Sequence, residues 1–303
     1  MTDRLVWLPF EPALLGDPPA ELRYEVVDPT HEVPDSVTDV RFYVPPYQVG
    51  SRVADVLPRM TGLEVVQTLT AGVVNLRGAV PDGVLLCNGR GIHDASTAEL
   101  AVTLALASLR GVPGFVRDQD RHEWKPGWRP ALADKRVLLV GYGAIGAAIE
   151  RRLEPFEVEV VRVARSARDG VHAITELPQL LPTADVVVLI VPVTAETRGM
   201  VDAGFLAAMQ DGALLVNAAR GVVVDTDALL AELTAGRLRA AVDVTEPEPL
   251  PEGHPLWSAP NLLLTPHVAG AVPDTNARAA AAVTDQLTRI LDGKPLENVV
   301  AEY

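Results

Sequence analysis

Cysteine, positive charge and long apolar runs are all scarce in this chain of 303 residues. Cys87 is the only cysteine, so no intramolecular disulfide can form, and a reducing, cytoplasmic environment is expected. The 26 Lys and Arg residues are outnumbered by 40 Asp and Glu, and the net charge of −14 argues against nucleic-acid binding. The longest apolar run, residues 186–193, is far too short to span a bilayer, and the N-terminus does not resemble a signal peptide. We therefore expect neither a nucleic acid nor a membrane as partner.

The length and a hydrophobic content of 48% predict a globular protein of one large or two medium domains. The first 95 residues combine short strands, turns and one helix into a small α/β unit. From residue 137 onward, apolar runs alternate with helical stretches, as a parallel sheet covered on both faces requires. We predict strands at 4–8, 41–44, 63–67, 84–87, 137–140, 158–163, 185–191, 213–217, 240–244 and 262–264, and helices at 48–59, 98–110 and 274–291.

A glycine-rich turn follows the predicted strand at 137–140 and precedes an Ala-rich, helical segment. It reads Gly141-Tyr-Gly143-Ala-Ile-Gly146, the G-x-G-x-x-G pattern of dinucleotide-binding proteins. Gly141 would allow the tight turn, Gly143 the close approach of a phosphate, and Gly146 the packing of helix on strand. The N–H groups at the start of the helix would bind the anion. The motif alone indicates some dinucleotide.

Three later strands are followed by polar stretches that contain Arg220, Glu248 and His267. Because ligands bind beyond the carboxyl ends of parallel strands, these side chains are candidates for a catalytic set. Hydride transfer to a carbonyl builds negative charge on its oxygen, and an imidazole such as His267 can donate the proton needed there. A carboxylate on the other ring nitrogen, with Glu248 as candidate, would fix the tautomer, and the planar guanidinium of Arg220 suits a substrate carboxylate. The set predicts a 2-oxo or 2-hydroxy acid as substrate.

The end of the second strand of the dinucleotide unit indicates which nicotinamide cofactor is bound. A preference for NAD needs an acid about 20 residues beyond the glycines, to accept the ribose 2′-OH. Ala164 stands at this position, followed by Arg165, Ser166 and Arg168. Two guanidiniums and a hydroxyl suit a 2′-phosphate, so we predict NADP(H) rather than NAD(H).

The motifs, taken in their order along the chain, resemble the D-isomer-specific 2-hydroxyacid dehydrogenases. The resemblance implies a Rossmann dinucleotide-binding domain, 96–270, inserted into a smaller flavodoxin-like α/β substrate domain made of 1–95 and 271–303. It implies Arg220, Glu248 and His267 as the catalytic residues and no metal. The matching stretches are AGVVNL (71–76), STAEL (96–100), VGYGAIG (140–146), VPVTAETRGMV (191–201), NAARGVVVD (217–225), AVDVTEPEPLPEGHPLW (241–257) and TPHVAG (265–270).

The resemblance also assigns individual binding residues. The family's catalytic acid lies five residues after the Asp of the D-V motif, which selects Glu248 over Glu246. Formate dehydrogenases of the family usually have Gln there, so Glu248 points to the hydroxyacid branch. Substrate would contact Ala71, Gly72, Val73, Arg220 and His267, although Val74 replaces an Asp that the family commonly has. Cofactor would contact Gly141, Tyr142, Gly143, Ala144, Ile145, Gly146, Arg165, Ser166, Arg168, Val191, Pro192, Thr197, Ala218, Ala219, Asp243 (through the nicotinamide amide), His267 and Gly270.

Several alternatives stay open at this point. Glyoxylate or hydroxypyruvate is the favoured substrate, but Arg52, Arg77 and Arg90 have no assigned role, so an NAD-dependent phosphoglycerate or D-lactate type dehydrogenase is an alternative. A dinucleotide-sensing binding protein, like the co-repressors that share this fold, is an alternative from another class. His93 is a further candidate for a substrate contact. The apolar helix at 98–110 and the Trp124 to Trp128 segment suit a symmetric interface, and the resemblance implies a homodimer.

Overall fold

The computed structural model describes residues 4–28, 33–47, 51–73, 76, 78–273 and 275–300, without the side chains of residues 51 and 52. The chain divides into two compact units. The smaller unit contains residues Met1–His93 and Pro273–Tyr303, and the larger unit contains Asp94–Val272. The larger unit is therefore one continuous piece of chain, whereas the smaller one is built from both ends.

The smaller unit is a parallel sheet of five strands in the order β2-β1-β3-β4-β5. This is the doubly wound order of the flavodoxin type. The sequence predicted four of the strands and missed β2, an edge strand with only one fully buried residue and therefore no apolar run. The strands are β1 Arg4–Leu8, β2 Leu22–Val26, β3 Val40–Tyr43, β4 Val65–Gln67 and β5 Leu85–Cys87.

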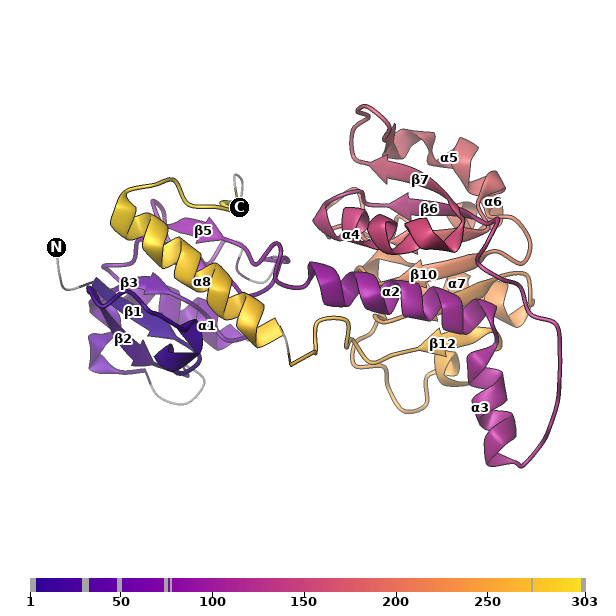
Figure 1. The fold of residues 1–303 in the computed structure, drawn as a ribbon, viewed down its shortest axis with the longest axis horizontal. Helices are drawn as coiled ribbons and strands as arrows, with labels where there is room; N and C mark the ends of the chain where they lie inside the picture. The colour runs from indigo at the N-terminus through magenta and orange to yellow at the C-terminus, as the bar shows by residue number, and fades with distance from the viewer. Residues whose placement is uncertain are drawn as a thin grey trace. The chain divides into compact units, whose positions relative to one another are not determined.

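A helix covers each face of this smaller sheet. Because side chains alternate along a strand, Leu5 and Trp7 of β1 face one way and Val6 and Leu8 the other. The first face packs against α1 Ser51–Val56 and the second against α8 Thr275–Asp292, which crosses the sheet in Figure 1. A helix was predicted at 48–59. Among the described residues, α1 ends at Val56, and a 3₁₀ turn at Leu57–Arg59 follows it.

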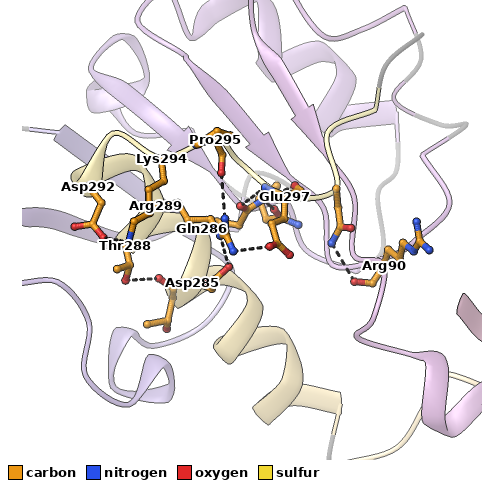
Figure 2. A network of polar contacts seen from close by, with 12 residues as sticks. Arg90, Asp285, Gln286, Thr288, Arg289, Asp292, Lys294, Pro295 and Glu297 are labelled. Carbon is orange, nitrogen blue, oxygen red and sulfur yellow. Dashed lines mark hydrogen bonds and ion pairs between the residues drawn. The ribbon is translucent and has the colours of Figure 1, made fainter.

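The end of the chain is tied to the edge of the smaller sheet by a polar network around Gln286 (Figure 2). The buried Gln286 amide donates to Gln67 Oε1 at 2.8 Å and to the Glu297 carbonyl at 2.9 Å, and it accepts the Glu297 N–H at 3.0 Å. Arg289 of α8 forms ion pairs with Asp285 and Glu297. Val300 then donates to the Leu86 carbonyl of β5 at 2.8 Å. The last described residues thus extend the sheet beyond β5.

The larger unit is a parallel sheet of seven strands in the order β12-β11-β10-β9-β6-β7-β8. The chain order reverses between β6 and β9, the switch point at which Rossmann folds bind dinucleotides. The predicted fold class is confirmed. Only β8 was missed, because two residues carry no periodic signal. The strands are β6 Arg136–Val140, β7 Glu159–Ala164, β8 His172–Ala173, β9 Val186–Leu189, β10 Leu214–Asn217, β11 Arg239–Val242 and β12 Leu262–Leu264.

Helices pack on both faces of the larger sheet, so its central strands are buried on both sides. On one face, Leu138 and Val140 of β6 lie in a core with α5 Leu177–Leu180, α6 Ala203–Ala208 and α7 Thr226–Thr234. On the other face, Val137 and Leu139 contact α2 Asp94–Leu109 and α4 Ala144–Leu153.

The long helix α2 begins four residues before the predicted start at residue 98. Ser96 and Thr97 are polar but buried, so their burial could not be read from hydrophobicity. Ala98, Ala101, Leu104 and Ala105 pack on the helix's own sheet, so the apolar surface of α2 is not by itself a sign of a partner. In the described ranges no single helix is long and apolar enough to cross a membrane. One pair, α2 and α3 Val112–Asp120, reaches the required length and hydropathy when the two helices are taken together, but they are bent by 66° relative to each other.

Candidate functional site

The glycine turn between β6 and α4 has two glycines packed against backbone. Gly141 has φ +110°, and its N–H and that of Tyr142 both donate to the Val163 carbonyl of β7 at 2.9 Å. A Cβ on Gly141 would lie 2.5 Å from the Ile190 oxygen, and a Cβ on Gly146 would lie 2.5 Å from the Gly141 oxygen. A side chain at either position would therefore clash with the protein's own backbone, whether or not a ligand is bound.

Gly143 differs from both, because a Cβ there would meet nothing within 4 Å. It is the N-cap of α4, and no side chain caps the helix. The first N–H groups of a helix have no partner within it and attract anions. Open space over Gly143, at the start of a helix and at the switch point of the sheet, fits the diphosphate of a dinucleotide.

The segment after β7 carries positive charge and no acid at the strand end. Ala164 ends β7, and Arg165, Ser166 and Arg168 are exposed. Neither arginine forms an ion pair with a carboxylate in the described part of the chain. Arg168 instead donates from Nη2 to the Tyr142 carbonyl at 2.6 Å, and its backbone closes a turn with Val171. Arg165 nevertheless interacts electrostatically with the Glu196 carboxylate, so of the two guanidiniums only that of Arg168 has no carboxylate partner in the described part of the chain.

His267 and Glu248 are in direct contact in the larger unit. His267 Nδ1 lies 2.5 Å from Glu248 Oε1, and both side chains are about two-fifths exposed. Glu248 follows β11 and His267 follows β12, so two neighbouring strands bring them to the same edge of the sheet. Glu246, the competing acid, is exposed and contributes its backbone carbonyl to the Thr226 hydroxyl at 2.7 Å. Nε2 of His267 is thereby left as the nitrogen available to a ligand.

Asp243 holds the turn that contains His267. Its side chain is 1% exposed, and it accepts hydrogen bonds from the Thr265 hydroxyl at 2.6 Å, Val268 N–H at 2.9 Å and Ala269 N–H at 3.0 Å. The His267 N–H donates to the Asp243 carbonyl at 2.7 Å, and His267 has the left-handed φ of +54°. A non-glycine residue in that region is held there by its surroundings. The family resemblance implied a nicotinamide contact for Asp243 but not this organising role.

Arg220 follows β10, the next strand in the sheet after β11. Asn217 fixes this turn, since its side chain accepts the Ala219 N–H at 3.0 Å and donates to the Arg220 carbonyl at 3.2 Å. A Cβ on Gly221 would lie 1.8 Å from the Thr245 oxygen, so the turns after β10 and β11 are in close contact. The exposed Arg220 thus stands on a rigid turn at the same sheet edge as Glu248 and His267.

The other predicted cofactor positions of the larger unit lie beyond β9, β10 and β12. Thr197 closes the turn after β9, its hydroxyl donating to the Pro192 carbonyl at 2.6 Å and accepting the Thr194 N–H at 2.8 Å. Ala218 and Ala219 are buried at the end of β10. Val191 lies two residues after the end of β9 and directly before Pro192, and Gly270 lies three residues after His267. Among the described residues no group of His, Cys, Asp and Glu is arranged to hold a metal ion.

The turn at 71–73 in the smaller unit has each of its carbonyls bound within the protein. The Ala71 carbonyl accepts from Asn88 Nδ2 at 3.2 Å, that of Gly72 from the Thr70 hydroxyl at 2.9 Å, and that of Val73 from the Leu76 N–H at 2.9 Å. No local pattern pointed to Asn88, because its contact with Ala71 spans 17 residues.

The remaining candidates of the smaller unit are only partly described. His93 Nε2 contacts the Leu69 carbonyl at 3.1 Å, and its ring lies edge-on to Tyr47, with centroids 5.6 Å apart. Arg90 is exposed on the loop after β5, where its carbonyl accepts from Asn298 at 3.2 Å (Figure 2). Val74, Arg77 and the side chain of Arg52 lie outside the described residues.

Comparisons with known proteins identify relatives for most of the chain. A model of the "D-isomer specific 2-hydroxyacid dehydrogenase, NAD binding domain" family matches residues 102–269. A glyoxylate reductase of Thermofilum pendens is 33% identical over 256 residues, 80% of this chain and 76% of that protein. A D-3-phosphoglycerate dehydrogenase of Methanocaldococcus jannaschii is 32% identical over 83% of this chain, which spans about half (50%) of that longer protein.

Among solved structures, an NADPH-dependent glyoxylate/hydroxypyruvate reductase of Sinorhizobium meliloti, in complex with NADP and sulfate, is similar over nearly the whole chain. The TM-score is 0.84 at 28% sequence identity, covering 99% of this chain and 98% of that one.

Proposed function

The chain belongs to the D-isomer specific 2-hydroxyacid dehydrogenase family of NAD(P)-dependent oxidoreductases, and we propose that it reduces small 2-oxo acids with NADPH. Glyoxylate and hydroxypyruvate are the favoured substrates, and the D-isomer is the product wherever a stereocentre forms. The observation that carries the proposal is the contact of 2.5 Å between His267 and Glu248 at the carboxyl edge of the dinucleotide-binding sheet.

Each of the three side chains has a distinct role in the proposed reaction. The nicotinamide, when bound, supplies the hydride. His267 donates a proton from Nε2 to the carbonyl oxygen, while Glu248 holds Nδ1–H and stabilises the positive ring. Arg220 binds the substrate carboxylate through its planar guanidinium.

The preference for NADP(H) over NAD(H) is supported by the segment after β7. Arg168 has no carboxylate partner among the described residues, Arg165 adds a second exposed positive charge nearby, and the Ala164 side chain offers no acceptor for a ribose 2′-OH. An NADP-bound relative of 28% identity is consistent with this preference. We expect catalytic efficiency with NADPH to exceed that with NADH by at least tenfold, and equal efficiencies would contradict the proposal.

A second candidate substrate is 3-phosphoglycerate, favoured by the relative from Methanocaldococcus jannaschii. The deciding experiment follows NADPH oxidation at 340 nm with glyoxylate, hydroxypyruvate, pyruvate and phosphohydroxypyruvate. We expect the two small unphosphorylated acids to give the highest kcat/KM. Fastest turnover of phosphohydroxypyruvate would instead select the phosphoglycerate reaction. Tight NADPH binding with no turnover of any acid would indicate a dinucleotide sensor.

We also propose that the protein is a cytoplasmic homodimer that associates through the α3 face. Trp124 and Trp128 are 96% and 99% exposed, and Val112 and Phe115 of α3 are partly exposed beside a groove bordered by Trp257. Exposed aromatic surface of this extent is typical of interfaces.

Sedimentation or light scattering would test the dimer directly. The double substitution Trp124→Ser with Trp128→Ser is expected to give a monomer. Leu14→Ser, at an exposed apolar residue of the smaller unit, is the matched control and should leave the mass unchanged. A monomeric wild-type protein at micromolar concentration would contradict the proposal.

A further inference from the structure

Tyr142, the residue between the first two glycines of the motif, is the centre of a cluster that the dinucleotide motif does not require. Its hydroxyl donates to Glu150 of α4, whose side chain is only 10% exposed. Arg162 of β7 donates to the same carboxylate, with Nε at 2.7 Å from Oε1. The three side chains therefore link the glycine turn, the helix after it and the second strand.

The charges of this cluster are balanced at Glu150. Burial alone would raise the pKa of the Glu150 carboxyl, but hydrogen bonds from Arg162 and Tyr142 outweigh it and lower that pKa. Hydrogen bonding to the ionised Glu150 raises the pKa of the Tyr142 hydroxyl, which keeps it a donor. Glu150 thus neutralises Arg162 and fixes the orientation of the Tyr142 ring.

Arg168 contacts the same tyrosine but not the carboxylate. Its guanidinium carbon lies 5.8 Å from the centre of the Tyr142 ring, within range of a cation–π contact, and its Nη2 donates to the Tyr142 carbonyl at 2.6 Å. The Arg162 guanidinium carbon lies 5.6 Å from the same ring. One arginine is therefore paired with Glu150, and the other is held by Tyr142 with its charge free for a ligand.

From this geometry we infer that Tyr142 is a positioning residue for cofactor discrimination, which holds Arg168 where it binds the 2′-phosphate of NADP(H). The inference rests on the proposed preference for NADP(H). An exposed arginine samples many rotamers, and binding a phosphate through it costs the entropy of ordering that side chain. A ring held in place by Glu150 and Arg162 restricts Arg168 before the ligand arrives. Glu150 acts through Tyr142 and does not contact the ligand.

The test uses two probes that differ only by the 2′-phosphate, adenosine 2′,5′-bisphosphate and adenosine 5′-monophosphate. Isothermal titration gives both dissociation constants. The ratio of the constant for the 5′-monophosphate to that for the 2′,5′-bisphosphate measures recognition of the 2′-phosphate separately from the rest of the site. Tyr142→Leu removes the ring and should lower this ratio by about two- to fivefold, the value of one exposed cation–π contact. Tyr142→Phe keeps the ring but loses its hydrogen bond to Glu150, so it should lower the ratio less than Tyr142→Leu does.

A double-mutant cycle with Arg168→Gln then assigns the effect to its partner. In the Arg168→Gln background, Tyr142→Leu should no longer change the ratio, because the side chain that it positions is gone. Additive effects of the two substitutions would overturn the inference, as would equal weakening of both probes by Tyr142→Leu. A wild-type ratio near one would mean that the proposed NADP(H) preference has itself failed. Urea unfolding of each variant verifies that the fold is retained.

Discussion

Replacing Glu248 by Gln removes the negative charge that lies beside His267 and leaves the volume of the side chain at position 248 almost unchanged. The amide oxygen of Gln can still accept the Nδ1–H bond that now spans 2.5 Å, so the tautomer of the ring is retained. What the variant loses is the attraction between a carboxylate and the imidazolium that donates the proton. The substitution therefore separates charge stabilisation from ring orientation.

The size of the effect follows from the exposure of the pair. A hydrogen bond between charged groups contributes about 1.5–3 kcal/mol, and solvent screens exposed pairs toward the lower end of this range. With side-chain exposures of 42% and 39% for His267 and Glu248, we expect a loss of about 1.5–2 kcal/mol. This corresponds to a decrease of about 10- to 30-fold in kcat. The free energy of unfolding should fall by less than about 1 kcal/mol.

The assay is NADPH oxidation with glyoxylate under saturating cofactor, together with urea unfolding. Glu246→Gln is the matched control, because Glu246 also precedes a proline, lies two residues away and makes its hydrogen bond through the backbone. The control should retain the wild-type kcat. A Glu248→Gln enzyme within twofold of wild type, or an equal loss in both variants, would refute the assignment of Glu248 as partner of His267.

Three further predictions concern neighbouring parts of the larger unit. Asp243→Asn places an NH₂ group opposite donors that now bind a carboxylate. The free energy of unfolding, measured with urea, should therefore fall by about 1–3 kcal/mol, and kcat in the 340 nm assay should fall as well. Gly143→Ala puts a methyl group into the open space at the start of α4, so it should weaken NADPH binding at least tenfold in fluorescence titration while lowering the free energy of unfolding by less than about 1 kcal/mol. Gly146→Ala puts its Cβ against a backbone oxygen and should lower the free energy of unfolding by more than about 1 kcal/mol. Because the pKa of Glu150 is lowered in the folded protein, its contribution to stability is present above the ordinary carboxyl pKa of 4.5 and is lost as the pH falls below it; Glu150→Gln should flatten this acid-side loss when unfolding is compared at pH 6 and pH 3.5.

The sequence was sufficient for the elements with strong local patterns. Strands β1 and β12 match their predicted bounds, because each is a short run of mostly apolar residues bounded by turn signals. The G-x-G-x-x-G turn and its place between a strand and a helix were also predictable. The order of the motifs was enough to predict the family. Edge strands β2 and β8 were not predictable, since one is half-exposed and the other has two residues.

What the tertiary structure alone decided was which distant side chains meet. The choice of Glu248 over Glu246 rested on a family resemblance, and only the folded chain brings one of them to 2.5 Å from His267. The link of Tyr142 with Glu150, Arg162 and Arg168, and the hold of Asp243 on the His267 turn, join residues that share no local pattern. Local sequence determines backbone preference and burial over a few residues, whereas these contacts depend on how neighbouring strands and helices are packed. The residues that carry charge at the site were therefore visible in the sequence, but the partners that orient them were not.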